Sequence, residues 1–239
     1  KGDNMFGLNW TNKLCKAFFG AANDNSAQHA QGVRYETPRL VLREIKADDV
    51  QRVHEISNAP GFFYYCFDGS LEKAQAFVDK AIQTQTPDPK TGYRSDVMLA
   101  VCEAGSDVMI GHVSLEAVDY VEGIGYEPNF FMDPNHQSTG YGREAVTNLM
   151  HHGFALLNVD QYTATAHPDN VRSQNVIKTL GFRKVADITM DTTKGPEPRE
   201  LYTLTQDDFY VSVAAYGKPV LPDLPPHYKM NAPVRDLKR

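Results

Sequence analysis

Several features of common protein classes are missing from this chain of 239 residues. It has only three cysteines, Cys15, Cys66 and Cys102, and no Cys-x-x-Cys pair, which argues against a disulfide framework and fits a reducing compartment. No apolar run approaches the roughly 18 residues that a membrane-spanning helix needs. The 24 basic residues are outnumbered by 30 acidic ones, so non-specific nucleic-acid binding by counterion release is not expected. These absences predict a cytoplasmic protein that binds neither membranes nor nucleic acid.

The usual motifs of metal sites and hydrolases are missing as well. His151 and His152 are adjacent and face different ways on a helix, while His136 and His167 lie in loops, so no metal-ligand spacing occurs. No Ser-His-Asp or Cys-His grouping carries a recognisable local motif. We therefore expect no metal site, and we expect the cysteines to be buried or neutral thiols.

The chain divides into three parts. Residues 1–35 are interpreted as an N-terminal extension with a short amphipathic helix from about Asn12 to Phe19, and residues 211–239 as a Pro-rich tail without periodicity. The tail either clasps a second subunit, giving a homodimer, or trails in solvent, and the sequence leaves both open. The residues between them, 36–210, are interpreted as one domain.

Hydrophobic periodicity within this domain predicts an α/β (α+β) fold with a mixed sheet. The expected strands are 39–45, 97–103, 108–118, 128–132, 161–166, 184–190 and 200–205, with a Pro- and Gly-containing loop between the last two. The expected helices are 47–57, a helix from Leu71 that Ser70 caps, a helix beginning near Gly140, and 170–182, which Gly181 ends.

The segment DPNHQSTGYGREA, residues 133–145, precedes the third helix and has three interpretations. It is a simple strand-to-helix turn, or its G-x-G-x-x-A match marks a dinucleotide fold. Context rejects the dinucleotide fold, because DPNHQST separates the glycines from the strand and Asp160 precedes its strand instead of ending it.

The third interpretation is an anion site at the helix N-terminus. Successive N–H groups from Gln137 to Gly142 attract a phosphate or diphosphate, and Gly140 and Gly142 let the anion approach the main chain. Arg143 adds positive charge. Glu144 must then point away from the anion.

Four stretches together resemble the GNAT acetyltransferase superfamily, and within it the RimJ/RimL-like branch. HQSTGYGREA fits the Q/R-x-x-G-x-G/A loop, with Gln137, Gly140 and Gly142 on its fixed positions. TPRLVLRE (37–44) is similar to the opening strand, NFFM before the loop to the central strand, and HPDNVRSQNVIKTLGF (167–182) to the later helix. The combination spans roughly residues 36 to 206 and is more specific than any one motif.

The resemblance implies a GNAT fold, with a mixed central sheet of six to seven strands, flanking helices and a split between the two central parallel strands. Acetyl-CoA would bind in this split as co-substrate, without a metal. The implied cofactor-binding residues are Phe130, Phe131, Met132, Gln137, Ser138, Thr139, Gly140, Tyr141, Gly142, Arg143 and Asn170.

The implied catalytic residues are less determined. For the general base, Asp119 and Glu127 rank equally. Many members use a tyrosine as general acid where this chain has Ile177, and the RimL-like branch is proposed to use a serine at the position of Ser173. Ser173 alternatively caps its helix, or no side-chain acid is needed because a thiolate leaves readily near neutral pH. The N–H near Met132 is the implied oxyanion donor.

The expected function is therefore transfer of an acetyl group from coenzyme A to a primary amine, on a protein or peptide N-terminus or a small molecule. The acidic segment 116–127 suits a cationic acceptor, and the aromatic segment 58–70 either lines the acceptor site or forms a core cluster. The alternative is a GNAT-fold sensor or interaction module that binds acetyl-CoA without turnover.

Overall fold

The computed structural model describes residues 33–62, 64, 66–86, 94, 96–118, 125–157, 161–192 and 195–215. Its strands are β1 (Arg34–Glu36), β2 (Leu40–Glu44), β3 (Val97–Glu103), β4 (Met109–Ala117), β5 (Tyr126–Met132), β6 (Gln161–Ala166), β7 (Arg183–Thr192) and β8 (Gly195–Thr205). Its helices are the 3-10 turns η1 (Ala47–Asp49) and η2 (Pro134–His136) and the α-helices α3 (Val50–Asn58), α4 (Leu71–Thr84), α5 (Tyr141–Leu157), α6 (Val171–Thr179) and α7 (Gln206–Ala215). The helix expected near Asn12 to Phe19 lies outside the described residues, as does Cys15.

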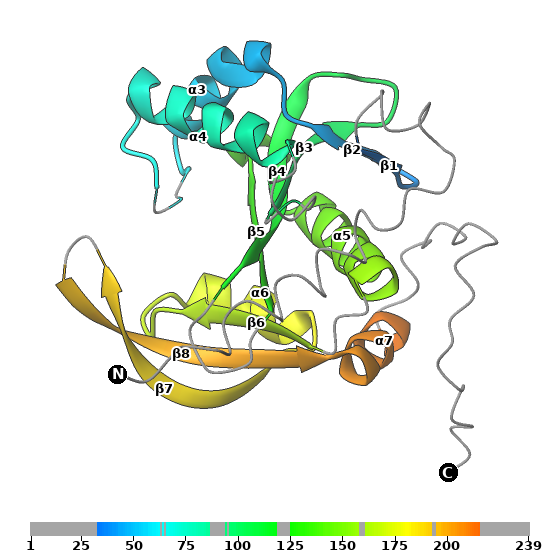
Figure 1. Cartoon of the computed structure of the whole chain (residues 1–239), viewed down its shortest axis with the longest axis vertical. Helices are drawn as coiled ribbons and strands as arrows, with labels where there is room; N and C mark the ends of the chain where they lie inside the picture. The colour runs from blue at the N-terminus through cyan, green and yellow to red at the C-terminus, as the bar shows by residue number, and fades with distance from the viewer. Residues whose placement is uncertain are drawn as a thin grey trace, which may run out of the picture.

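All these strands form one mixed sheet in the order β1-β2-β3-β4-β5-β6-β8-β7. Neighbouring strands are antiparallel except β5 and β6, which are parallel and share a single registered pair, Tyr126 with Tyr162. Beyond that pair the strands separate: β5 rises away from β6, while β6, β8 and β7 lie across the lower part of the molecule (Figure 1). The predicted mixed sheet with a split between two central parallel strands is confirmed.

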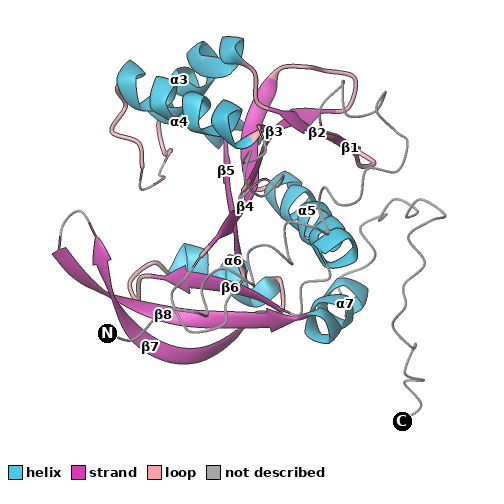
Figure 2. Cartoon of the chain, in the orientation of Figure 1, coloured by secondary structure: helices cyan, strands magenta, loops and turns pink. Residues whose placement is uncertain are grey.

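Helices cover both faces of the sheet (Figure 2). On one face, α3 and α4 pack over the strands through a cluster that includes Val53, Val78 and Phe131. On the other face, α5 packs through a cluster that includes Leu149 and Met132. Successive residues of a strand point to opposite faces, which is why Phe131 and Met132 belong to different clusters.

The sheet has more strands than the six to seven expected. β1 is a three-residue edge strand, too short for a periodic pattern to reveal. The predicted loop before the last strand is wrong, because Thr192 pairs with Gly195 and Thr189 with Pro198, which extends the β7–β8 hairpin. Proline is tolerated there because β6 pairs with β8 only from Glu200 onward, so the earlier residues have a strand on one side only.

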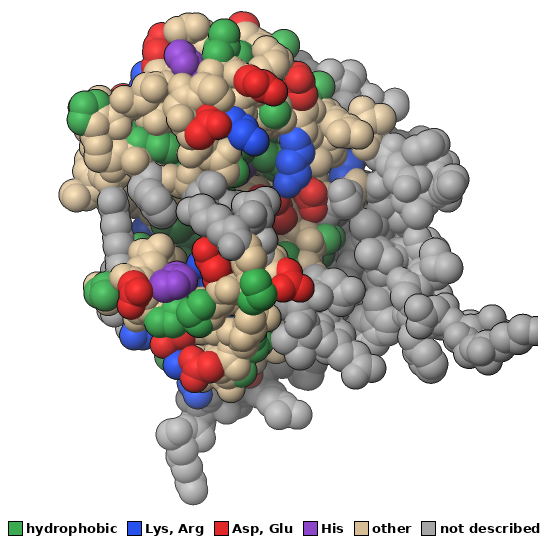
Figure 3. Space-filling view, turned by 90° about the vertical axis from the view of Figure 1, so that its left-hand side faces the viewer, with side chains coloured by type: hydrophobic (Ala, Val, Ile, Leu, Met, Phe, Trp, Pro, Cys, Tyr) green, Lys and Arg blue, Asp and Glu red, His purple; other side chains and the backbone are tan. Residues whose placement is uncertain are grey.

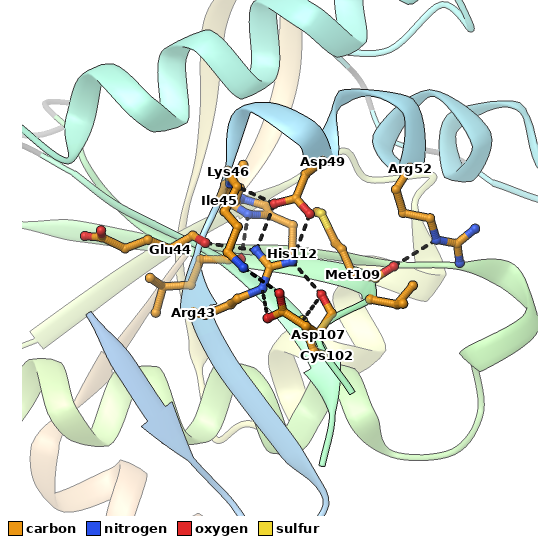
Figure 4. Close-up of polar contacts among 12 residues, drawn as sticks. Arg43, Glu44, Ile45, Lys46, Asp49, Arg52, Cys102, Asp107, Met109 and His112 are labelled. Carbon is orange, nitrogen blue, oxygen red and sulfur yellow. Dashed lines mark hydrogen bonds and ion pairs between the residues drawn. The ribbon is translucent and has the colours of Figure 1, made fainter. Parts of the chain in front are cut away.

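The segment expected to be a single helix at 47–57 begins instead with the 3-10 turn η1, where a buried ion pair holds Asp49 (Figure 4). Both terminal nitrogens of Arg43, in β2, donate to the Asp49 carboxylate at 2.8 Å. Nε of Arg43 lies 2.8 Å from the carboxylate of Asp107, in the turn between β3 and β4. Because the Arg43 side chain is only 6% exposed, this network fixes the entry to α3.

The sequence analysis does not predict helix α7. Its Phe209 and Val213 join the cluster under α5, and Asp207 and Asp208 lie in its first turn, where negative charge is favourable. It runs across the predicted boundary between the domain, which ends at residue 210, and the tail, which begins at residue 211. The three-part division of the chain stays a prediction. In the described ranges, no helix has both the length and the apolar character needed to cross a membrane.

Candidate functional site

The loop between β5 and α5 presents main-chain N–H groups at the start of the helix. Asp133 fixes its first turn, where Oδ1 accepts a hydrogen bond from the N–H of Asn135 at 2.9 Å. Ser138 and Gly140 have positive φ values of 62° and 82°, whereas the residue between them does not. Such alternation turns successive N–H groups toward one concave side. Within the described part of the chain, nothing accepts a hydrogen bond from the N–H of Ser138, Gly140 or Gly142.

A set of contacts that the sequence did not reveal holds this loop against the turn between β1 and β2. Oε1 of Glu144 accepts from the Thr37 hydroxyl at 2.6 Å and from the Arg39 N–H at 3.1 Å, and Oε2 accepts from Nε of Arg39 at 2.7 Å. Nη1 of Arg39 also donates to the Thr139 carbonyl at 3.0 Å. We call these residues the Arg39–Glu144 clamp. The clamp turns the Glu144 carboxylate toward the β1–β2 turn, away from the proposed anion site at the helix N-terminus.

The two loop glycines meet different needs. A Cβ on Gly142 would lie 3.0 Å from the Phe130 ring, so glycine there allows α5 to pack against β5. A Cβ on Gly140 would have ordinary space, with its nearest contact at 3.4 Å, and the positive φ is what favours glycine. Gly142 therefore has a packing role between α5 and β5, in addition to the role expected from the sequence, which is to let an anion approach the main chain.

Most other predicted cofactor residues have contacts within the protein. The Tyr141 hydroxyl donates to Glu103 at 3.0 Å, and the Arg39 guanidinium lies 4.8 Å from the centre of its ring. The Thr139 hydroxyl donates to the His136 carbonyl at 2.7 Å. Side chains therefore anchor the loop, and main-chain groups remain available for a ligand.

The main chain at the end of β5 faces the split. Asp133 donates its N–H to Ile110 in β4 at 2.9 Å, so by strand alternation the N–H and C=O groups of Phe130 and Met132 point away from β4, toward β6. The strands are already separated at this level, because β5 pairs with β6 only at Tyr126. Nε2 of Gln137 donates to the Met132 carbonyl at 3.1 Å. The side chain of Phe130 packs toward α5 and that of Phe131 under α3 and α4, which leaves their main chain for the split.

Glu127 bridges the two strands where they separate. Its Oε1 accepts hydrogen bonds from the N–H of Thr165 in β6 at 2.7 Å and from the Thr165 hydroxyl at 3.3 Å. The residue is 7% exposed. Glu116 lies directly opposite it in β4, and opposed residues of an antiparallel pair share one face. Two carboxylates therefore lie beside the split on the α3–α4 face.

The remaining predicted site residues are on α6 or outside the described residues. Oδ1 of Asn170 accepts the N–H of Ser173 at 3.0 Å, which caps α6. Ser173 is half-buried, and Ile177 is buried in the core cluster under α5. In the described structure no hydrogen bond joins Ser173 to Glu127. Asp119 lies outside the described residues.

The described cysteines and several histidines are held in neutral forms. Burial raises the pKa of the Cys66 and Cys102 thiols to about 11. Burial also lowers the pKa of His112 and His152 to about 4. The described residues contain no group of three His, Cys, Asp or Glu side chains that could hold a metal ion.

The site matches a ligand that joins an amide-bearing chain to a diphosphate. The open edge of β5 offers main-chain donors and acceptors to amides, as a neighbouring strand would. The N–H groups of Ser138, Gly140 and Gly142 at the head of α5 suit a diphosphate. Coenzyme A has both parts, so the residues present fit acetyl-CoA.

Comparison with known proteins identifies the family of the chain. The family model described as an acetyltransferase (GNAT) domain matches residues 39–183. The uncharacterized N-acetyltransferase YnaD of Bacillus subtilis is 29% identical over 163 residues, which cover 67% of this chain and 89% of YnaD.

Among solved structures, RimJ of Mycobacterium smegmatis in complex with CoA-disulfide is similar at 13% identity, with a TM-score of 0.61 and coverage of 80% of this chain and 97% of that one. A chimera containing the spermidine N-acetyltransferase SpeG of Vibrio cholerae is similar at 17% identity, with a TM-score of 0.55 and coverage of 72% and 98%. At these identities the structures show a shared fold. With the family match across most of the domain, the chain belongs to the GNAT family and is an acetyltransferase.

Proposed function

We propose that the protein is an acetyl-CoA-dependent N-acetyltransferase of the RimJ/RimL-like branch, which acetylates a primary amine by direct attack in a ternary complex. The acceptor amine belongs to a protein or peptide N-terminus or to a small molecule. One observation carries the proposal: the open edge of β5 leads directly to a loop in which the N–H groups of Ser138, Gly140 and Gly142 have no partner among the described residues.

The main chain would hold most of the cofactor. The N–H and C=O groups of Phe130 and the C=O of Met132 would pair with the amides of the pantetheine arm, and Asn170 would approach the arm from α6. The N–H groups from Gln137 to Gly142 would hold the diphosphate, with Arg143 nearby. When bound, acetyl-CoA supplies an activated acetyl thioester.

Glu127 is the proposed general base. An amine attacks only in its neutral form, so a carboxylate beside the split has to take a proton from it, directly or through water. The N–H of Met132 faces the split and would stabilise negative charge that develops on the acetyl oxygen. Ser173 is the proposed proton donor to the leaving thiolate, and Asp119 is the second candidate for the base.

The anion site is tested with a pair of glycine variants. Gly140→Asp places a carboxylate at the proposed diphosphate site and should weaken coenzyme A binding at least a hundredfold, measured by isothermal titration calorimetry. Gly105→Asp is the matched control, because Gly105 has the same φ of 82° and a Cβ there would meet nothing within 4 Å, but it lies in the β3–β4 turn. Equal affinity in the two variants would refute the proposed role of the loop.

Turnover distinguishes the enzyme from a binding module. The protein is mixed with acetyl-CoA and a panel of amines, including peptides with free N-termini, and free thiol is followed with time. Thiol release that depends on the amine supports transfer. Thermal stabilisation by acetyl-CoA without thiol release would favour a sensor or interaction module instead.

A further inference from the structure

A cavity of about 230 Å³ lies on the α3–α4 face, and part of its lining is next to the proposed site of acetyl transfer. Tyr64, Phe77 and Met98 line it with apolar surface. Glu116 lines it as well, and Glu116 is the residue directly opposite Glu127 in the β4–β5 pair. An amine placed for deprotonation by Glu127 would therefore have the rest of its molecule beside this cavity.

The negative charge of the Glu116 carboxylate is already paired with a positive charge of the protein. Nζ of Lys80, from α4, lies 2.8 Å from Oε2, and the Ser114 hydroxyl donates to Oε1 at 2.8 Å. Although burial opposes the charge of Glu116, the hydrogen bond and the charge of Lys80 hold the pKa of its carboxyl below the ordinary value. The Lys80 ammonium thus occupies the position that a cationic group of an acceptor would take.

The other charged group of the cavity adds to this effect. Lys73 also lines the cavity and forms no ion pair with any described residue. Asp96, the other carboxylate near Lys80, does not line the cavity, and its Oδ1 accepts the N–H of Ala117 at 3.0 Å. On the side toward which the split opens, basic and acidic side chains lie next to one another along the lower border of the α3–α4 part (Figure 3). A cation that entered the cavity would therefore meet two ammonium groups. Among the described residues that line the cavity, it would find no carboxylate without a partner.

We propose that this cavity receives an uncharged, largely apolar part of the acceptor, and that Lys80 excludes acceptors with a second cationic group. The inference rests on the proposed function. The acceptor class of the protein is then a monoamine or a peptide N-terminus with an uncharged first side chain, and polyamines are excluded as acceptors. The acidic residues of segment 116–127 suggest a cationic acceptor, and the Lys80–Glu116 pair argues against that expectation at Glu116.

The test compares two amines of equal length, pentylamine and 1,5-diaminopentane, which differ in one ammonium group. Each is titrated by calorimetry into the protein saturated with coenzyme A. The wild type should bind pentylamine more tightly. Lys80→Met removes the half-exposed cation that pairs with Glu116 and frees that carboxylate, which is 18% exposed, so the affinity ratio should shift at least tenfold toward the diamine, a typical effect of one charge in a partly buried site.

Two further variants make the result specific. Lys73→Met removes a lysine of the same helix and the same cavity without freeing a carboxylate, so it should shift the ratio by only a few fold. Lys80→Met combined with Glu116→Gln should return the ratio to the wild-type value or below. An unfolded Lys80→Met protein is replaced by Lys80→Gln, which has the same expected outcome.

The outcomes distinguish failure of the inference about Lys80 from failure of the proposed function. If the wild type binds coenzyme A but already prefers the diamine, or if freeing Glu116 leaves the ratio unchanged, the inference about Lys80 is overturned and the proposed function stands. If the wild type binds no coenzyme A, the proposed function itself fails.

Discussion

Glu116 and Glu127 are neighbours across two strands, yet their surroundings suit different tasks. The Lys80 ammonium lies 2.8 Å from Glu116 and favours its charged form. A carboxylate whose pKa is held low is a weak proton acceptor. Glu127 lies at the point where the strands part, and its Oε1 accepts hydrogen bonds there from the N–H and the hydroxyl of Thr165. Of the two, Glu127 is the better candidate for the base.

Replacing Glu127 with glutamine should lower kcat by about 10² to 10⁴, the usual contribution of a general base. Glutamine keeps the length of the side chain and can still accept the Thr165 hydrogen bonds, so the affinity for coenzyme A should change little. Steady-state kinetics and calorimetry together measure the two effects. Asp119→Asn is assayed in parallel, and wild-type turnover in both variants would remove these carboxylates from the mechanism.

At the scale of elements, local signals in the sequence are sufficient to predict many helices and strands. Ser70 is a predicted helix cap, and its hydroxyl accepts the N–H of Lys73 at 3.2 Å at the start of α4. The strands β3, β4 and β6 and the start of α5 also follow the periodic pattern closely. These elements could be predicted because caps, turns and alternation lie within a few residues of one another.

Contacts between distant segments could not be predicted in this way. Arg39 resembles one more residue of an edge strand, and nothing near it in the sequence marks it as a partner of Glu144, which is 105 residues away. The opposed pair Glu116 and Glu127 depends on strand register, which the sequence did not specify. The family resemblance supplied the split between β5 and β6, whereas the clamp and the ion pair of Lys80 came only from the folded arrangement.

The Arg39–Glu144 clamp joins the β1–β2 turn to α5 and should support cofactor binding. Arg39→Gln removes the charge that holds Glu144 and frees its carboxylate at the head of α5, where it would compete with a bound anion. We expect the Kd for coenzyme A, measured by calorimetry, to rise by about tenfold, equivalent to about 1.4 kcal/mol.

Arg34→Gln is the control for the clamp, because Arg34 lies on the neighbouring strand β1, is half exposed and pairs with Glu36. Its Kd should match that of the wild type. Equal Kd values for Arg39→Gln and Arg34→Gln would show that the clamp does not affect cofactor binding.

For the whole molecule, buried histidines connect stability to pH. His112 lies between Phe77 and Phe131 on the α3–α4 face, and on the other face the His152 ring stacks on Tyr35 at 4.0 Å. Burial lowers the pKa of both to about 4, from an ordinary value of 6.5. Below pH 6.5 the unfolded chain therefore takes up protons that the native state does not bind. The stabilising contribution of both residues is present above that pH and is lost as the pH falls toward 4.

His152→Phe isolates one of these contributions, because phenylalanine retains an aromatic ring for stacking on Tyr35 but does not titrate. We expect the free energy of unfolding of the wild type to fall by about 2 to 3 kcal/mol more than that of the variant between pH 7 and pH 4.5, because burial lowers the pKa of His152 from 6.5 to about 4. Urea unfolding at a series of pH values measures both curves. Parallel curves for the wild type and His152→Phe would mean that His152 is protonated as readily in the native protein as in the unfolded chain.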